Sequence, residues 1–292
     1  MNGYEEIMTK RYGERYVKYR EILKSRDIES CLDFPLHIDL DLVDACNLKC
    51  PTCHSIGRDR LRKPMDEGTL LRVISEFGEH DLPSVNIGGC GEPLVDTELT
   101  LRAMCELKKT SVMDIFLHTN GVLLNEDHSK SLIGAGLTYL CVSVDAVTQE
   151  VYGKMRDHTL SGIIRNVENF LSLRSGGLPA LRVSFLATAV NIHEKDRFID
   201  FWKDKADVID IQNYHRYYDV QPDVRLKEKI ADRQPVVHRM EKRMAVTAPE
   251  YLCVSCSGVS VSAAIKHGDT LSKYETIKNY WDNRIIAGVP RR

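Results

Sequence analysis

The sequence lacks the features that mark several large classes of protein. Its 292 residues contain no apolar run of the about 18–20 residues that a membrane-spanning helix needs. The first residues carry no apolar segment of a secretory signal, so we expect a cytoplasmic protein. The formal net charge is only −2, which gives no reason to expect nucleic acid or an anionic membrane as the main partner. With 43% apolar residues, the chain can build one large core and a small appendage.

A regular disulfide framework is also absent. The chain has nine cysteines, and an odd number without a secretory signal favours metal binding or reactive thiols over disulfides. Three of them, Cys46, Cys50 and Cys53, crowd into the segment CNLKCPTC. Such thiolates can ligate three irons of a [4Fe–4S] cluster and leave the fourth iron open to a substrate or cofactor. Spacing alone leaves open two alternatives, half of a zinc site and three unrelated thiols.

Short strand-like runs alternate with helical patterns from residue 36 onward. The runs are 36–42, 84–88, 114–120, 139–145, 181–188 and 208–215. This alternation predicts right-handed βαβ units and a parallel sheet. Before it, residues 1–30 have the spacing of one amphipathic helix docked on the domain. We therefore expect a helical N-terminal segment, an α/β core and a C-terminal cap, at 1–35, 36–215 and 216–292.

Polar and apolar residues alternate along each predicted strand. Because successive side chains point to opposite faces, each strand shows an apolar side to the helices and a polar side to the interior. A filled eight-stranded barrel packs bulky branched side chains in its lumen. Six strands with a polar interior instead predict a partial (β/α)6 barrel, open on one side and holding a polar ligand. For the inward-facing His37 and His118, satisfied polar contacts are favoured over catalysis.

Three loops at the carboxyl ends of these strands carry chemistry, and ligands of parallel α/β folds bind at those ends. The cysteine segment follows the first strand. The second strand runs into Gly88-Gly89-Cys90-Gly91-Glu92-Pro93, where glycines allow close approach and Glu92 can accept a hydrogen bond from a cationic group. The third ends at Thr119-Asn120-Gly121, with Asn120 on the polar face. We expect the three loops to form one binding site.

Together these motifs resemble the radical SAM superfamily over roughly residues 36–215. The resemblance is carried by the CxxxCxxC segment, the GxGEP of Gly89 to Pro93, the TNG after the third strand, and the SVDA of Ser143 to Ala146. It implies a [4Fe–4S] cluster held by Cys46, Cys50 and Cys53, whose open iron binds S-adenosylmethionine. The residues that it implies to contact this cofactor are Gly89, Gly91, Glu92, Asn120, Ser143, Asp145, Thr188, Asn191 and Ile211. One departure is Thr52, at a position that is often aromatic in the family.

The resemblance also implies a reaction. The reduced cluster passes one electron to the sulfonium, and the resulting 5′-deoxyadenosyl radical abstracts hydrogen from a substrate C–H bond. The polar interior favours a small molecule such as a sugar, an aminocyclitol or a natural-product intermediate, with epimerisation or dehydrogenation as the expected outcome. A one-electron donor such as flavodoxin or ferredoxin is expected as partner. The alternatives are a peptide-modifying radical SAM enzyme and, from another class, a non-catalytic zinc or Fe–S binding scaffold.

The C-terminal region is similar to the SPASM or twitch extensions of radical SAM enzymes, which bind auxiliary Fe–S clusters. It contributes only Cys253 and Cys256, too few thiolates for a full second cluster. Three interpretations stay open: a partial auxiliary cluster, a thiol that donates hydrogen to the substrate radical, and simple packing. Cys31 and Cys105 are expected to be packing residues, and Cys90 and Cys141 have no assigned role.

Overall fold

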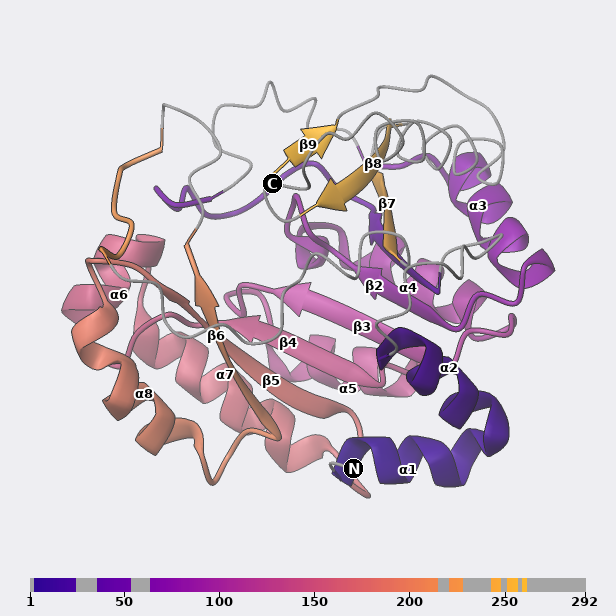
Figure 1. The fold of residues 1–292 in the computed structure, drawn as a ribbon, viewed down its shortest axis with the longest axis horizontal. Helices are drawn as coiled ribbons and strands as arrows, with labels where there is room; N and C mark the ends of the chain where they lie inside the picture. The colour runs from indigo at the N-terminus through magenta and orange to yellow at the C-terminus, as the bar shows by residue number, and fades with distance from the viewer. Residues whose placement is uncertain are drawn as a thin grey trace, which may run out of the picture.

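The computed structural model describes residues 3–24, 36–53, 64–214 and 221–227, and the backbone of three further strands at 243–247, 251–256 and 259–261. Its centre is a sheet of six parallel strands, each within two residues of a predicted range (Figure 1). These strands are β1 (His37–Asp41), β2 (Ser84–Ile87), β3 (Asp114–Thr119), β4 (Tyr139–Ser143), β5 (Ala180–Ala187) and β6 (Val208–Asn213). The intervening helices are α3 (Glu67–Glu79), η1 (Pro93–Asp96), α4 (Thr97–Leu107), α5 (Glu126–Gly134), α6 (Gln149–Arg156), α7 (Leu160–Leu173), η2 (Ile192–Glu194) and α8 (Lys195–Trp202).

The strand order confirms a partial barrel. Neighbours along the chain are neighbours in the sheet, in the order β6-β5-β4-β3-β2-β1, and every pair is parallel. The sheet continues past β1 through β7 (Arg243–Thr247), which is parallel to β1, and then through the antiparallel β8 (Tyr251–Cys256) and β9 (Val259–Val261). The predicted C-terminal cap therefore adds strands to the open edge. Among the described helices, none is long and apolar enough to cross a bilayer.

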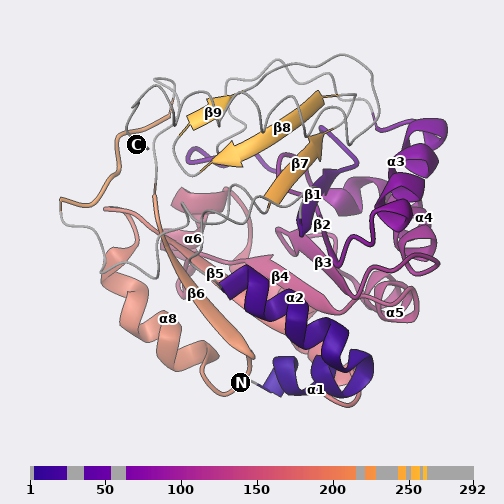
Figure 2. The same ribbon diagram turned by 45° about the vertical axis from the view of Figure 1, so that its right-hand side comes forward.

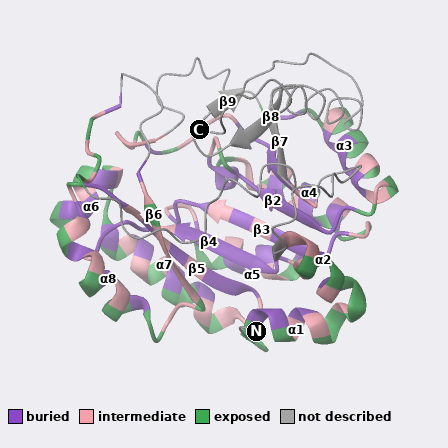
Figure 3. Cartoon of the chain, viewed as in Figure 1, coloured by how far each residue is buried: buried purple, intermediate pink, exposed green. Residues whose placement is uncertain are grey.

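The main core lies between the outer face of the sheet and the helices α3 to α8. The apolar side of each strand points outward as expected, so Ile38, Val85 and Phe185 are fully buried against the helices. In α3 and α7 the apolar residues recur at helical spacing. Figure 3 shows the strands of the sheet mostly in purple, whereas buried and exposed residues alternate along the helices. Thr148 caps α6 as its sequence position predicts, because its side chain accepts a hydrogen bond from the Val151 amide.

The N-terminal segment differs from the prediction of a single helix. It forms α1 (Gly3–Tyr12) and α2 (Glu14–Lys24), and the chain breaks between them at Gly13, whose φ is +61°. That left-handed conformation is easily adopted by glycine, and the Gly13 amide closes α1 by donating to the Thr9 carbonyl at 2.8 Å. The break lets the two helices pack against each other on the side of the sheet opposite α3 to α8 (Figure 2).

This helix pair closes the lower part of the lumen. Met8, Tyr16 and Tyr19 pack with Tyr139 and other inward residues at the amino-terminal ends of the strands. The rest of the inner face is polar, as predicted, and its groups pair with one another. The His37 ring is 2.7 Å from Ser84 Oγ, and the His118 ring is 2.5 Å from Asn86 Oδ1. Both histidines thus make the satisfied contacts that were favoured over catalysis.

Candidate active site

The three clustered cysteines lie on the loop that leaves the carboxyl end of β1. All three are half-buried. Two of the sulfur atoms face N–H donors: Cys46 Sγ accepts from the Leu48 amide at 3.4 Å and from Asn120 Nδ2 at 3.8 Å, and Cys50 Sγ accepts from Arg156 Nη1 at 3.9 Å. Such donors stabilise thiolates, which is the form of cysteine that binds metal.

The glycine-rich loop after β2 packs directly beneath the cysteine loop. At Gly91 a β-carbon would lie only 1.8 Å from the Val43 carbonyl oxygen, so the position tolerates no side chain. The next residue, Glu92, donates its backbone amide to the Ala45 carbonyl at 2.8 Å. The Cys90 amide donates to Asp41 Oδ1 at 2.9 Å, and a β-carbon on Gly89 would meet the same oxygen at 3.2 Å. The two loops therefore form one unit, as the sequence predicts.

The Glu92 carboxylate joins this unit to the loop after β3. Its Oε1 accepts hydrogen bonds from Thr119 Oγ1 at 2.7 Å and from the Leu94 amide at 3.1 Å, and its Oε2 accepts from the Asn120 amide at 2.8 Å. Burial raises the pKa of Glu92, while the hydrogen bonds from these donors act in the opposite direction. The carboxylate thus already accepts hydrogen bonds from three donors within the protein. Its contact with the methionine amine of the cofactor stays a prediction.

Asn120 brings the third loop against the cysteines. Its Nδ2 donates to Asn47 Oδ1 at 2.8 Å as well as to Cys46 Sγ. Its Oδ1 accepts from the Val122 amide at 2.9 Å, which fixes the orientation of the side-chain amide. The three loops that the sequence singles out therefore meet at one place.

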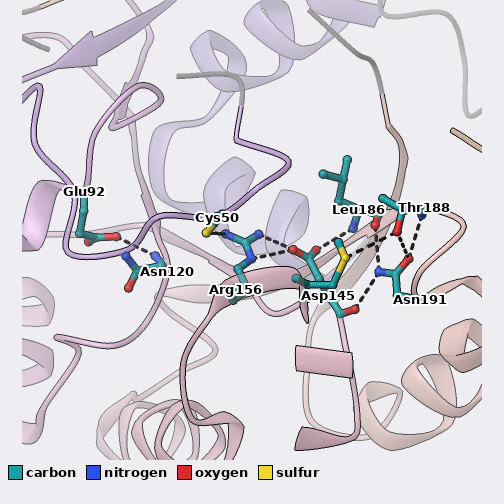
Figure 4. A network of polar contacts seen from close by, with 9 residues as sticks. Cys50, Glu92, Asn120, Asp145, Arg156, Leu186, Thr188 and Asn191 are labelled. Atoms are coloured by element: carbon teal, nitrogen blue, oxygen red, sulfur yellow. Dashed lines mark hydrogen bonds and ion pairs between the residues drawn. The ribbon is translucent and has the colours of Figure 1, made fainter. Parts of the chain in front are cut away.

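A second group of predicted residues lies at the ends of β4 and β5 (Figure 4). Asp145 is buried with φ +67°, a conformation uncommon outside glycine, and its Oδ1 accepts from the Leu186 amide at 2.7 Å. Asn191 donates to the Asp145 and Leu186 carbonyls at 2.8 and 2.9 Å. Thr188 donates its hydroxyl to Asn191 Oδ1 at 2.9 Å. These three side chains form one network through hydrogen bonds within the protein.

The other predicted cofactor residues are less tightly held. Ser143, the last residue of β4, is half-buried. Ile211 on β6 is also half-buried, and its side chain packs against the main core on the outer face, so only its backbone is available to a ligand in the lumen. Their contacts with the cofactor stay predictions.

Two contacting residues were missed by the sequence analysis. Arg156, at the end of α6, links Asp145 to Cys50. Gln221 Nε2 donates to the carbonyls of Thr52 and Cys53 at 3.2 and 2.9 Å, which ties a segment beyond β6 to the cysteine loop. No local spacing signals either contact. The nearest cue is that an arginine follows the SVDA motif at the end of a short amphipathic helix.

The remaining cysteines divide into three groups. Cys253 and Cys256 lie on β8, where the backbone pairs Cys253 with Ala245, but their side chains lie outside the described residues, as does Cys31. Cys141 is buried beneath the N-terminal helices and Cys90 is half-buried. Cys105, expected to be a packing residue, is instead exposed, because it lies on the solvent side of α4.

The chemistry of the cysteine loop fits a [4Fe–4S] cluster. Burial raises the pKa of the Cys50 thiol, and the Arg156 guanidinium counteracts this shift. In the described part of the chain, no three histidine, cysteine or acidic side chains converge on a position for one metal ion. In a [4Fe–4S] cluster each thiolate binds a different iron, so three ligands on one loop need not converge on a single point. Cys46, Cys50 and Cys53 would hold three irons of such a cluster, and the fourth iron would take another ligand.

Comparison with known proteins agrees with this geometry. Residues 41–196 match the family model of the radical SAM superfamily. A probable GTP 3′,8-cyclase of Methanococcus vannielii is 30% identical over 210 residues, which are 68% of this chain and 67% of that protein. A protein of the same name from Methanocaldococcus jannaschii is 28% identical over 70% of each chain. The chain thus spans about two thirds of the length of these relatives.

Solved structures show the same fold. Streptococcus suis SuiB bound to S-adenosylmethionine superposes with a TM-score of 0.65 at 16% identity, over 89% of this chain and 69% of that chain. SuiB bound to its precursor peptide SuiA superposes with a TM-score of 0.66. The family match covers more than half of the chain and contains the cysteine loop, the glycine-rich loop and the strands β2 to β5. The chain therefore belongs to the radical SAM superfamily, a family of enzymes that use a [4Fe–4S] cluster and S-adenosylmethionine.

Proposed function

We propose that Cys46, Cys50 and Cys53 hold the cluster and that the enzyme abstracts hydrogen from a C–H bond of a polar small molecule. The observation that carries this proposal is the joining of three loops at one end of the sheet. Gly91 packs on the backbone of the cysteine loop, and Asn120 donates to Cys46 Sγ. When bound, the cluster and S-adenosylmethionine supply the one-electron chemistry, and this chain's residues hold the cofactors in place and exclude competing reactions.

The charges on the inner face support a neutral or cationic substrate. Within the described strands β1 to β6, the inward side chains include four carboxylates, Asp39, Asp41, Asp114 and Asp210, and one guanidinium, Arg182. Arg182 lies 3.7 Å from Asp210, so its charge is already partly balanced. Sugars and aminocyclitols carry hydroxyl or amino groups that such a surface can bind. Epimerisation or dehydrogenation of such a molecule is the proposed outcome.

A second candidate is the cyclisation of GTP, because the relatives named probable GTP 3′,8-cyclase are up to about 31% identical to this chain. A triphosphate is usually held by several arginine or lysine side chains. The single arginine on the described inner faces favours the first candidate, and peptide modification remains the other alternative. An electron donor of the flavodoxin or ferredoxin class and a cytoplasmic location complete the proposal.

Iron content tests the cluster site. The wild-type protein and a Cys46/Cys50/Cys53 triple alanine variant are reconstituted anaerobically, and iron and sulfide per chain are measured. Exposed Cys105→Ala serves as the control for loss of a thiol. The proposal expects the triple variant alone to lose a complete cluster of four irons. Bound zinc without iron in the wild type would favour the non-catalytic scaffold.

Product analysis tests the substrate class. The reconstituted enzyme is incubated under reducing conditions with S-adenosylmethionine and with neutral sugars, aminocyclitols, GTP or peptides, and formation of 5′-deoxyadenosine is followed. Stimulation by a sugar or aminocyclitol supports the proposal, whereas a cyclised product from GTP would replace it with the second candidate. Solvent deuterium in the product distinguishes epimerisation from dehydrogenation. Loss of that deuterium in Cys253→Ala or Cys256→Ala would identify the hydrogen donor.

A further inference from the structure

A buried ion pair contacts one of the three cysteines. Arg156 donates Nε to Asp145 Oδ2 at 2.7 Å, and its Nη2 lies 2.5 Å from the same oxygen. The remaining arm of the guanidinium, Nη1, donates to Cys50 Sγ at 3.9 Å (Figure 4). The side chain of Arg156 is only 17% exposed and that of Asp145 only 1%, so water screens this pair weakly.

Asp145 holds the guanidinium in one orientation. Its Oδ1 is occupied by the Leu186 amide, and its carbonyl accepts from Asn191, so the carboxylate cannot turn away. Arginine stays charged at any physiological pH. Because the guanidinium group is planar and rigid, holding Nε and Nη2 at Asp145 Oδ2 also fixes the position of Nη1. The sulfur of Cys50 therefore has a permanent cation and an N–H donor at a fixed distance.

Reduction adds negative charge to a [4Fe–4S] cluster and its ligands. Hydrogen bonds to the ligand sulfurs and nearby net charge are among the main determinants of the potential at which this occurs. A cation with an N–H donor aimed at a sulfur stabilises the reduced state more than the oxidised state. We propose that Arg156 is a positioning residue that raises the reduction potential of the cluster through Cys50, with Asp145 limiting how much of its charge the sulfur experiences.

This inference rests on the proposed ligation of the cluster by Cys46, Cys50 and Cys53, and its test needs no turnover. The midpoint potential of the reconstituted cluster is measured by redox titration with electron paramagnetic resonance, in the absence of S-adenosylmethionine. In Arg156→Gln we expect the ratio of reduced to oxidised cluster at a fixed potential to fall about tenfold, which is a shift of about 59 mV for one electron. Arg156→Lys keeps the charge but loses the fork, and its potential should lie between the two.

Lys154 provides the matched control. It lies on the same helix, but its side chain is 58% exposed and pairs with Glu150, so Lys154→Gln removes one positive charge away from the cluster. Its potential should equal that of the wild type. A comparable fall in Lys154→Gln would show that overall charge, rather than the Arg156 contact, sets the potential, and would overturn the inference.

A double variant separates this effect from a folding defect. Arg156→Gln leaves Asp145 buried without its cation, whereas Asp145→Asn combined with Arg156→Gln removes both charges and keeps an acceptor for the Leu186 amide. We expect the double variant to take up four irons and to have a lower potential than the wild type. An unchanged potential with full iron content would overturn this inference and leave the cluster site intact. Absence of iron in the wild type would overturn both.

Discussion

Gly91→Ala tests directly whether the glycine-rich loop positions the cysteine loop. A β-carbon at this position would lie 1.8 Å from the Val43 oxygen, 2.8 Å from the Ala45 oxygen and 2.9 Å from the Val43 carbonyl carbon. All three atoms belong to the backbone, so no side-chain rotation can relieve the overlap. The cysteine loop has to move away by about 1 Å or more before an ordinary van der Waals distance is restored.

The expected cost follows from what this movement breaks. Overpacking of a closely packed site costs about 1–3 kcal/mol. The movement also stretches the hydrogen bond of 2.8 Å from the Glu92 amide to the Ala45 carbonyl, a loss of about 1 kcal/mol. We therefore expect the free energy of unfolding of the cluster-free protein to fall by about 2–4 kcal/mol. The displaced loop should also take up less iron, since Cys46 begins one residue after Ala45.

Urea unfolding and iron content per chain are the assays, both carried out anaerobically. Gly162→Ala on α7 is the matched control, because a β-carbon there meets no atom within 4 Å. Since alanine favours a helix interior over glycine, this control should unfold at the same or a slightly higher urea concentration. Wild-type stability and wild-type iron content in Gly91→Ala would refute the idea that close backbone approach at Gly91 builds the site.

Three further predictions concern stability. In Gly13→Ala the new β-carbon meets no neighbouring atom, but the alanine has to adopt φ +61°. The free energy of unfolding should therefore fall by about 1–2 kcal/mol, and an unchanged thermal midpoint would contradict the strain argument. Burial raises the pKa of Asp114 from 3.8 to about 6, so folding favours its protonated form. As pH rises from below 3.8 through 6, the free energy of unfolding of the wild type should therefore fall by about 2–3 kcal/mol relative to that of Asp114→Asn. A constant difference between the urea midpoints of the two proteins across that range would exclude this linkage. Glu92→Gln places an N–H donor where Glu92 Oε2 accepts from the Asn120 amide, so the free energy of unfolding should fall by about 1–3 kcal/mol without any cofactor present. If calorimetry shows no loss of stability, these hydrogen bonds do not require the carboxylate, and Glu92 is free to bind the methionine amine.

The architecture of the barrel was largely predictable from the sequence. Alternation of polar and apolar residues depends on neighbours two positions apart, and helical spacing on neighbours three or four apart, so both patterns are visible locally. The prediction of a single N-terminal helix was wrong, because Gly13 adopts a left-handed conformation that ends the first helix. The spacing of the apolar residues continues across Gly13 and therefore does not reveal this break. The exposure of Cys105 was missed because cysteine is usually buried, whereas its helix face decides its exposure.

The sequence by itself determined the six-stranded pattern, the three-cysteine segment and the loops that follow the first three strands. Only the tertiary structure decided how these loops contact one another and which charges face the sulfurs. Arg156 and Cys50 are 106 positions apart, and Gln221 and Thr52 are 169 apart, so no local period relates them. Such contacts arise because parallel strands bring their carboxyl ends to one edge, where residues distant in the chain share the same small volume.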